Sequence, residues 1–307
     1  MVCVNVRKLA GEDEVLGLTS MLPWWAKLGA KLALARLPIP YGFWKKLGIF
    51  RHGEMMVPER AIAAFEGHIA SALERTTLPA GFNSLELGPG DSVLTGFVAR
   101  AHGAGKAWLI DAGPFAETDV AGCRAIVELL SGRGRPLPPV TAQTLAGAMS
   151  DAGICYLTQG TSSLATIPAA SVHYFWSQVV LEHVYRHEFP DMMRELRRVV
   201  HPGAIGVHSI DFRDHLGGAL NNLRFADKVW EAPGFRDSGF YTNRIRPREM
   251  VAMMEAAGFD VELIQESRWP AMPTPRRAMA PEFQGLADED FMVREIRVVL
   301  RPRPRHV

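Results

Sequence analysis

Residues Leu85-Glu86-Leu87-Gly88-Pro89-Gly90-Asp91-Ser92, in one-letter code LELGPGDS, run from an apolar segment into a glycine turn. The apolar positions predict a buried strand at residues 84–87, and the pattern that follows predicts a helix at residues 93–102. Glycines let the backbone approach a ligand closely, and the N–H groups at the start of the helix would point at that ligand. The stretch therefore predicts a ligand-binding turn between a strand and a helix.

The segments on either side of this turn alternate between strand-like and helix-like patterns. Strands are predicted at residues 84–87, 106–111, 154–157, 172–177, 204–212, 259–266 and 294–300. Helices are predicted at residues 58–74, 93–102, 120–130, 141–151, 189–200 and 247–257. The alternation predicts an α/β fold that is doubly wound, with a mostly parallel sheet and helices on both faces. In such a sheet ligands bind outside the carboxyl ends of the strands.

Composition limits the classes of function. The chain has 307 residues, of which 48% are hydrophobic and 22% charged, and its formal net charge is +1. That balance argues against a protein whose main task is binding nucleic acid, because neutralising phosphates needs an excess of Lys and Arg. Cys3, Cys123 and Cys155 lie far apart in the sequence, which favours a reducing compartment. No apolar run reaches the roughly 18 residues of a membrane span, and we read no signal peptide, so we expect a cytoplasmic protein.

A basic segment stands near the start of the chain. Residues 21–52 contain lysines and arginines but no acidic residue, and Trp24 and Trp25 lie among them. The spacing predicts an amphipathic helix that is broken at Pro38 and Pro40. One interpretation is a pair of helices that pack on the domain and cover the mouth of the site. The other is a surface helix that contacts anionic lipid at the membrane periphery.

The residues around the glycine turn distinguish between ligands. A dinucleotide fingerprint needs a third glycine, and Val93 stands in its place. Glu86 precedes the turn, and Asp111 lies at the end of the next predicted strand, where a carboxylate can accept hydrogen bonds from ribose hydroxyls. A ligand with a cationic amine or sulfonium and a ribose suits this arrangement better than a pyrophosphate does. S-adenosylmethionine is such a ligand.

The sequence resembles the class I, Rossmann-like, S-adenosylmethionine-dependent methyltransferases. LELGPGDS is similar to their glycine-rich first motif, and LIDAG to their acid-bearing second strand. SVHYFWSQVVLEHV and ELRRVVHPGAIGVHSID resemble their fourth strand, the helix after it and the fifth strand. The resemblance implies a seven-stranded sheet, S-adenosylmethionine as cofactor, and a transferase that moves its methyl group.

The resemblance also implies roles for individual residues. Those expected to contact the cofactor are Glu86, Gly88, Gly90, Asp91, Ser92, Asp111, Gln159, Gly160, Ser177 and Gln178. The first three would surround its methionine part, and Asp111 its ribose. Two positions depart from the family pattern, because His173 and Thr161 stand where many relatives carry an acid.

Transfer to a hydroxyl needs a base, and histidine is the side chain best matched to neutral pH. We consider His183, just beyond the fourth predicted strand, and His215, oriented by Asp211 or Asp214 after the fifth. The Asp and His residues of this second group could instead hold Mg²⁺ against a sugar diol, but their spacing is not diagnostic of a metal site, and we predict none.

A segment rich in Asn, aromatic residues and Arg is inserted after the fifth strand. Methyltransferases of this family commonly build the acceptor pocket from such an insertion, and the candidates here are Trp230, Tyr241, Asn243, Arg244 and Arg246. Arginines can bind phosphate or carboxylate, and aromatic faces suit a sugar ring. Alternatively the arginines pair with Glu231, Asp237 and Glu249 in a lid helix.

The motifs together predict a domain organisation. We expect an N-terminal helical cap at residues 1–80, a methyltransferase domain at 81–302 with a substrate lid at 213–247, and a disordered tail at 303–307.

The runs SQVVLEHV, DHLGGALNNLRF and SGFYTNRIR also resemble bacterial methyltransferases associated with assembly of surface polysaccharide. This implies O-methylation of a sugar, a glycan or another small hydroxyl-bearing acceptor. The alternatives are a small-molecule N-methyltransferase and a catalytically silent S-adenosylmethionine-binding protein. A nucleic-acid base methyltransferase is disfavoured, because SQVV occupies the place of the Asp/Asn-Pro-Pro-aromatic loop of the enzymes that methylate amino groups of DNA bases.

Overall fold

The computed structural model describes residues 23–35 and 55–304. Within them the chain forms two compact units. One contains the helix α1 (Trp24–Ala35) together with Arg213–Thr242 and Pro273–Leu286, and the other contains the sheet. The predicted domain boundaries stay a prediction. Apart from α1, most of the basic segment at residues 21–52, on which the predicted lipid contact depends, lies outside the described residues.

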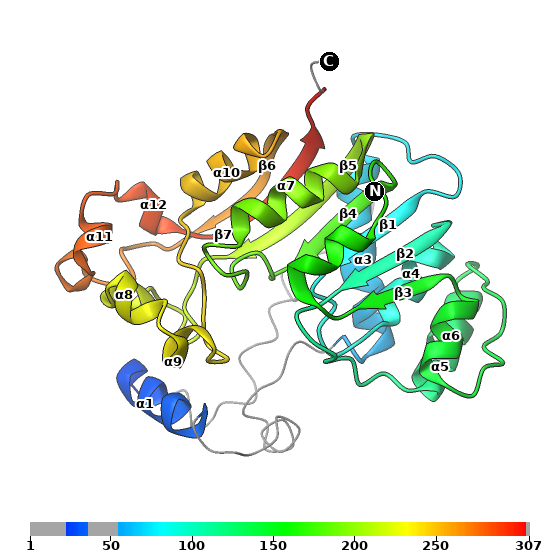
Figure 1. Ribbon diagram of the computed structural model, residues 1–307, viewed down its shortest axis with the longest axis horizontal. Helices are drawn as coiled ribbons and strands as arrows, with labels where there is room; N and C mark the ends of the chain where they lie inside the picture. The colour runs from blue at the N-terminus through cyan, green and yellow to red at the C-terminus, as the bar shows by residue number, and fades with distance from the viewer. Residues whose placement is uncertain (1–22, 36–54, 305–307) are drawn as a thin grey trace. The chain divides into compact units, whose positions relative to one another are not determined.

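The second unit is built on a seven-stranded sheet with the order β3-β2-β1-β4-β5-β7-β6 (Figure 1). Its strands are β1 (Asn83–Leu87), β2 (Lys106–Ile110), β3 (Ile154–Leu157), β4 (Val172–Gln178), β5 (Val200–Asp211), β6 (Phe259–Arg268) and β7 (Val293–Pro302). The first five are parallel, and β7 is antiparallel to β5 and to β6. The predicted fold class, a doubly wound and mostly parallel seven-stranded sheet, is confirmed.

The α-helices of this unit are α3 (Pro58–Leu73), α4 (Leu94–Ala101), α5 (Val120–Gly132), α6 (Leu145–Asp151), α7 (Phe189–Val199), α10 (Pro247–Ala256) and α12 (Glu289–Met292), and its 3-10 helix is η1 (Gly160–Thr166). The first unit contains α1, η2 (Asn221–Arg224), α8 (Asp227–Trp230), α9 (Pro233–Arg236), η3 (Arg276–Ala278) and α11 (Pro281–Gln284). Each long helix predicted from the apolar spacing is present in the structure.

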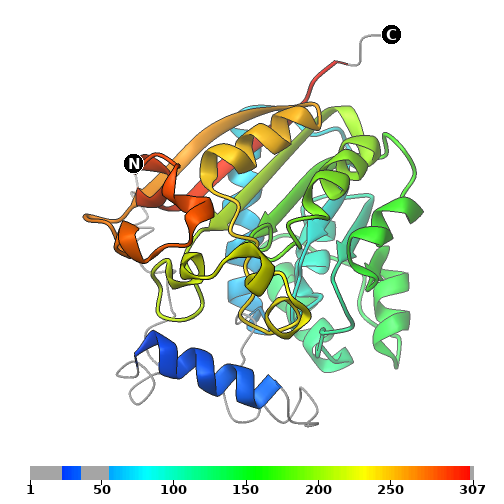
Figure 2. The same ribbon diagram turned by 60° about the vertical axis from the view of Figure 1, so that its left-hand side comes forward.

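Two hydrophobic cores fill the layers on either side of the sheet. One contains Phe65 of α3 and Phe97 of α4 packed against Trp176 of β4, and the other contains Met193 of α7 and Met254 of α10. Figures 1 and 2 show α7 and α10 on one face and α3 on the other. Burial on both faces explains why the successive residues Tyr174, Phe175 and Trp176 of β4 are all bulky and buried.

Two predicted boundaries differ from the structure for local reasons. The helix predicted from residue 141 begins at Leu145, because the Thr144 side chain caps it by accepting a hydrogen bond from the Gly147 N–H at 3.1 Å. The strand predicted from residue 204 begins at Val200, which pairs with Val172 at the start of β4. Pairing with a neighbouring strand thus extends β5 through a segment that contains proline and glycine.

Candidate active site

The glycine turn lies where the connectivity of the sheet reverses, between β1 and its neighbours β2 and β4. Gly88 and Gly90 have φ angles of +69° and +68°, a region that residues with a Cβ rarely adopt. The Gly88 N–H donates to the Ile110 carbonyl at 2.7 Å. A Cβ on Gly88 would lie 2.4 Å from Cγ2 of Val180. Both the backbone angle and the close approach of the next loop therefore require glycine here.

Asp111, directly after β2, is tied to this turn. Its Oδ2 accepts a hydrogen bond from the Gly90 N–H at 2.8 Å, and its Oδ1 accepts one from the Ala112 N–H at 2.7 Å. The residue is 8% exposed. Burial raises the pKa of its carboxyl to about 6, against the two backbone donors, which lower it. The turn and the carboxylate thus form one hydrogen-bonded unit at the switch point.

Glu86 points to the face of the sheet that α4 covers. Thr95 of α4 donates its hydroxyl to Glu86 Oε2 at 2.5 Å, and the Glu86 side chain is buried. Burial, with a smaller contribution from the nearby Asp111, raises the pKa of this carboxyl to about 8 although the Thr95 hydrogen bond lowers it, so Glu86 is protonated at neutral pH without a ligand.

The loops after β1 and β3 are organised by internal hydrogen bonds. Ser92 is buried, and its Oγ accepts from the Leu94 N–H at 3.1 Å, while Asp91 is buried beside it. Gly160 has a φ of +60° and donates its N–H to the Asp111 carbonyl at 2.8 Å. Gln159 is exposed next to it. The turns that carry the predicted cofactor residues after β1, β2 and β3 therefore lie along one edge of the sheet.

Ser177 and Gln178, the predicted residues at the end of β4, each form a hydrogen bond with a histidine. Ser177 Oγ and His208 Nδ1 of β5 share a hydrogen bond of 2.7 Å, and both residues are fully buried. Burial lowers the pKa of His208 to about 3, so this histidine is neutral and enclosed rather than available as a base. On the opposite face, His68 of α3 donates from Nε2 to Gln178 Oε1 at 2.6 Å.

Some residues of this edge were not predicted from the sequence. Val179, directly after β4, has a φ of +56°, which is rare for a β-branched residue and marks backbone strain of the kind found at functional sites. Tyr156 of β3 holds the loop after Asp111: its hydroxyl accepts from the Phe115 and Ala116 N–H groups and donates to the Gly113 carbonyl. No local motif identifies either residue, since both effects depend on contacts between distant segments.

The base candidates fall in different units. His183 is exposed, and its N–H donates to the Val180 carbonyl at 2.9 Å in the loop after β4. Asp211 is buried at the end of β5, and its N–H donates to Glu182 Oε1 at 3.3 Å. His215 belongs to the other unit, where both carboxylate oxygens of the neighbouring Asp214 accept backbone N–H groups of the same loop. Asp214 therefore organises its own loop.

The substrate candidates are also divided. In the first unit Trp230 is fully buried and donates Nε1 to the Thr242 carbonyl at 2.8 Å, and the Tyr241 hydroxyl donates to Glu231 at 2.9 Å. Trp230 stacks on Phe225 with ring centroids 5.7 Å apart. These aromatic residues form the centre of that unit, which adds a packing role to the predicted one.

In the sheet unit, Asn243 donates its side-chain amide to the carbonyls of Leu181 and Val184, at 2.8 and 3.0 Å. The Arg246 guanidinium donates to the carbonyls of Asp290 and Phe212, and burial lowers its pKa to about 10. Both side chains thus anchor loops around the carboxyl edge. Arg244 is buried with a φ of +59°.

The described residues contain neither a metal-binding cluster nor a membrane-spanning helix. No group of three or more His, Cys, Asp and Glu side chains among residues 23–35 and 55–304 could hold a metal ion. In the same part of the chain, no helix is both long and apolar enough to cross a membrane.

No protein-family model matches the sequence, and no curated protein sequence matches it. Several solved structures are similar to this chain at low identity. The YcgJ protein of Bacillus subtilis is 14% identical with a TM-score of 0.44, over 80% of this chain and all of its own. A SAM-dependent methyltransferase of Methanosarcina mazei is 13% identical with a TM-score of 0.41, over 74% of this chain and 95% of its own. Phosphoethanolamine N-methyltransferase 2 of Haemonchus contortus is 11% identical with a TM-score of 0.44, over 77% of this chain and 52% of its own. Because every one of these scores is below 0.5, we base the function on the residues of this chain.

Proposed function

We propose that this protein is an S-adenosylmethionine-dependent methyltransferase that O-methylates a sugar, a glycan or another small hydroxyl-bearing acceptor. One arrangement supports the cofactor above all: the positive-φ glycines at the switch point and the buried Asp111 carboxylate, joined by the 2.8 Å hydrogen bond from Gly90. The glycines leave room for a ligand close to the backbone, and the carboxylate can accept from a ribose diol.

The cofactor, when bound, supplies a methyl group that its sulfonium has already activated. The chain then has to position the acceptor, exclude water and remove a proton. In this proposal Gly88 and Gly90 hold the amino-acid part and Asp111 the ribose. Gln159 and Gly160 lie by the adenine, and the end of β4 forms the floor.

His183 is the base that we propose first. It is exposed directly after β4, so it can exchange its proton with solvent, whereas His208 is buried with a pKa lowered to about 3. His215, with Asp211 or Asp214 orienting it, stays the alternative prediction. The association with surface polysaccharide and the lipid contact of residues 21–52 also stay predictions.

The first test is calorimetric titration of the purified chain with S-adenosylmethionine, S-adenosylhomocysteine and NAD in parallel. The proposal predicts micromolar binding of both adenosyl ligands and none of NAD. Failure of both adenosyl ligands in folded protein would reject it. A catalytically silent binding protein needs no base. If the protein binds both ligands but whatever function it has is unchanged in His183→Ala and His215→Ala, it is such a binding protein rather than a transferase.

A second test addresses Asp111. Replacement by Ala removes charge-assisted hydrogen bonds worth roughly 1.5 to 3 kcal/mol, so affinity for S-adenosylhomocysteine should fall more than tenfold. Because only the ionised carboxylate accepts both ribose hydroxyls, and its pKa is raised to about 6, affinity in the wild type should also fall as the pH drops below about 6. Unchanged calorimetric affinity in Asp111→Ala would reject the ribose assignment.

A further inference from the structure

A row of polar side chains crosses three adjacent strands near the glycine turn. Gln178 of β4 pairs with Ser209 of β5, which pairs with Arg297 of β7. We call these three residues the polar row. The residues two positions away on the same strands, Trp176, Val207 and Val299, lie in the core beneath α3. Because side chains alternate along a strand, the polar row faces the same side of the sheet, where the apolar core ends.

The hydrogen bonds within the polar row leave donors available. Arg297 Nε donates to Ser209 Oγ at 3.0 Å, and Gln178 Oε1 accepts from His68 Nε2. The Gln178 amide nitrogen and the two terminal nitrogens of Arg297 make no further hydrogen bond to the described residues. His68 is 1% exposed, whereas the members of the polar row are half-buried and so open to solvent.

Arg297 forms no ion pair with a carboxylate of the described residues, although it is half-buried. Burial is the largest influence on its guanidinium and lowers its pKa. The neighbouring Tyr174 hydroxyl gives no counter-charge at neutral pH, because burial raises its own pKa well above the ordinary value. A partly desolvated cation without a counter-charge is costly unless a ligand supplies one.

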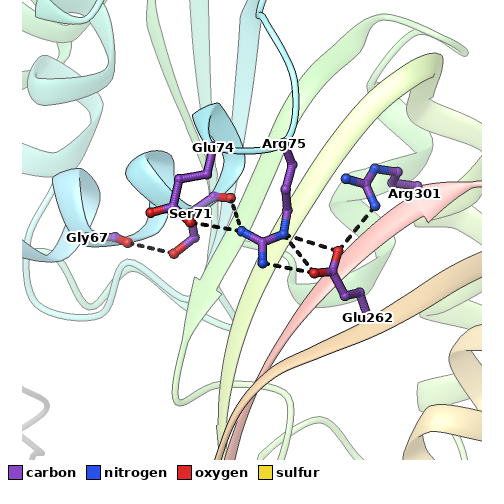
Figure 3. Close-up of polar contacts among 6 residues, drawn as sticks. All are labelled: Gly67, Ser71, Glu74, Arg75, Glu262 and Arg301. Atoms are coloured by element: carbon purple, nitrogen blue, oxygen red, sulfur yellow. Dashed lines mark hydrogen bonds and ion pairs between the residues drawn. The ribbon is translucent and has the colours of Figure 1, made fainter.

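Arg301, on the same strand and the same face, shows the usual arrangement. It donates to Glu262 of β6, which also accepts three hydrogen bonds from Arg75 just after α3 (Figure 3). An acid partner for Arg301 thus comes from the neighbouring strand. Arg297, which lies near the carboxyl ends of the parallel strands, has no such acid partner among the described residues.

The polar row begins beside the proposed cofactor site and leads away from it. Leu87, just before the glycine turn, pairs with Ser177, so Gln178 stands next to the turn. Arg297 lies three strands from β1, or about 14 Å at about 4.8 Å a strand. Asp111 and Gly160 lie on the other side of β1. An anion bound at Arg297 is therefore placed to belong to the methyl acceptor rather than to the cofactor.

We propose that Gln178, Ser209 and Arg297, with His68 orienting Gln178, bind a carboxylate or phosphate group of the methyl acceptor. This inference rests on the proposed function and narrows it, because it makes the acceptor an anionic molecule. His68 is a positioning residue: its ring holds the Gln178 carbonyl oxygen and so turns the amide N–H groups outward.

The test compares Arg297→Met with Arg301→Met, a matched control on the same strand. The full chain, with and without saturating S-adenosylhomocysteine, is titrated with inorganic phosphate and, separately, with acetate. We expect saturable binding of one of these anions to the wild type and to Arg301→Met, and at least a tenfold loss in Arg297→Met. Arg297→Lys should restore part of the affinity, because it keeps the charge but not the paired donors. The affinity for S-adenosylhomocysteine should stay within twofold in all variants.

Three results would overturn the inference. One is a wild type that binds neither anion, and another is an Arg297→Met protein that binds them as the wild type does. The third is a tenfold loss of S-adenosylhomocysteine in Arg297→Met, which would assign Arg297 to the cofactor's own carboxylate. A wild type that binds the anion but no adenosyl ligand would reject the proposed function while confirming an anion site. Thermal unfolding of each variant shows whether the substitution leaves the fold intact, and Arg297→Gln, for which the same tenfold loss is expected, replaces Arg297→Met if it does not.

Discussion

Polar groups are arranged differently at the two ends of the parallel strands, which we call the amino edge, where strands β1 to β5 begin, and the carboxyl edge, where they end. At the amino edge, the Asn83 N–H donates to His173 Nδ1 at 3.2 Å, and the Asn83 amide donates to the Ser171 carbonyl at 3.0 Å. Arg75 and Arg301 share Glu262. At the carboxyl edge, Glu86, Asp111 and His68 are buried and Arg297 is half-buried, and none of the four forms an ion pair with another described residue.

Carboxyl groups show the difference most directly. Hydrogen bonds from Arg75 lower the pKa of Glu262, whereas burial raises that of Glu86 to about 8. The first shift reports a group that is already satisfied, and the second a group held in an environment that disfavours its charge. Uncompensated charged and polar groups along one edge are expected where a ligand completes the structure. On the proposed function, the amino edge serves stability and the carboxyl edge serves binding.

The largest effect is expected from alanine at two glycines that flank β1. Gly81 at the amino edge and Gly88 at the carboxyl edge have nearly equal φ angles of +66° and +69°. Nothing lies within 4 Å of a Cβ on Gly81, whereas one on Gly88 would meet Val180 at 2.4 Å. Gly81→Ala should lower the free energy of unfolding by about 1–2 kcal/mol, from backbone strain alone.

Gly88→Ala adds overpacking of about 1–3 kcal/mol to the same strain. It should also abolish binding of S-adenosylhomocysteine, because the loop after β4 must move away. Urea unfolding and calorimetry of both variants test this, and Gly81→Ala should keep its affinity for the ligand. Equal loss of stability in the two variants would show that the close packing of Val180 against Gly88 is unimportant. The two edges would then not differ in how tightly their turns are packed.

The same two glycines show how far sequence reasoning reaches. LELGPGDS and the alternating apolar segments predicted the seven strands of the sheet and the place of the glycine turn, because these features depend on short spacings. Their partners come from distant segments: Val180 against Gly88, Thr95 on Glu86 and Tyr156 on the loop after Asp111.

The polar row could not be predicted from the sequence for the same reason. Its members come from three strands, and only the pairing register of those strands brings them side by side. His208 shows the same limit, because neither its complete burial nor its hydrogen bond to Ser177 of the neighbouring strand follows from the residues beside it in the sequence.

The next largest effect concerns the charge of Glu86 and depends on pH. Its folded pKa, about 8, lies above the ordinary 4.5, so the unfolded state loses a proton between these values that the folded state keeps. Stability contributed by the protonated carboxyl is therefore complete below pH 4.5 and lost as pH rises towards 8, at about 1.4 kcal/mol per pH unit. Glu86→Gln removes this loss, so without ligand it should be more stable than the wild type by on the order of 3 kcal/mol at pH 7. The two proteins should be equal near pH 4.

The difference in stability between Glu86→Gln and the wild type reports the titration of Glu86 alone. His68 and His208, whose pKa values burial lowers to about 3, work in the other direction, because the unfolded state gains protons as pH falls below 6.5. Both histidines are present in both proteins, so their contributions cancel in the difference. Urea unfolding from pH 4 to pH 8 measures it. A variant that is less stable than the wild type at pH 7 would mean that Glu86 is ionised in the fold, and the carboxyl edge would then not be strained by burial.

The smallest effect is expected at the amino edge, from Glu262→Gln. The side chain of Glu262 is 43% exposed, and Arg75 and Arg301 contact it at 2.8 and 3.3 Å. Pairs this exposed contribute about 0.2–1 kcal/mol and are screened by salt, so the variant should lose no more than this at pH 7 and low salt. Because the pKa of Glu262 is lowered in the folded state, its contribution is present above pH 4.5 and disappears as the carboxylate is protonated at lower pH. Urea unfolding at pH 7 and pH 3, with and without added salt, measures the loss. A loss above about 2 kcal/mol that salt does not reduce would place Glu262 among the buried and strongly coupled groups, and the two edges would then differ in ligand binding alone.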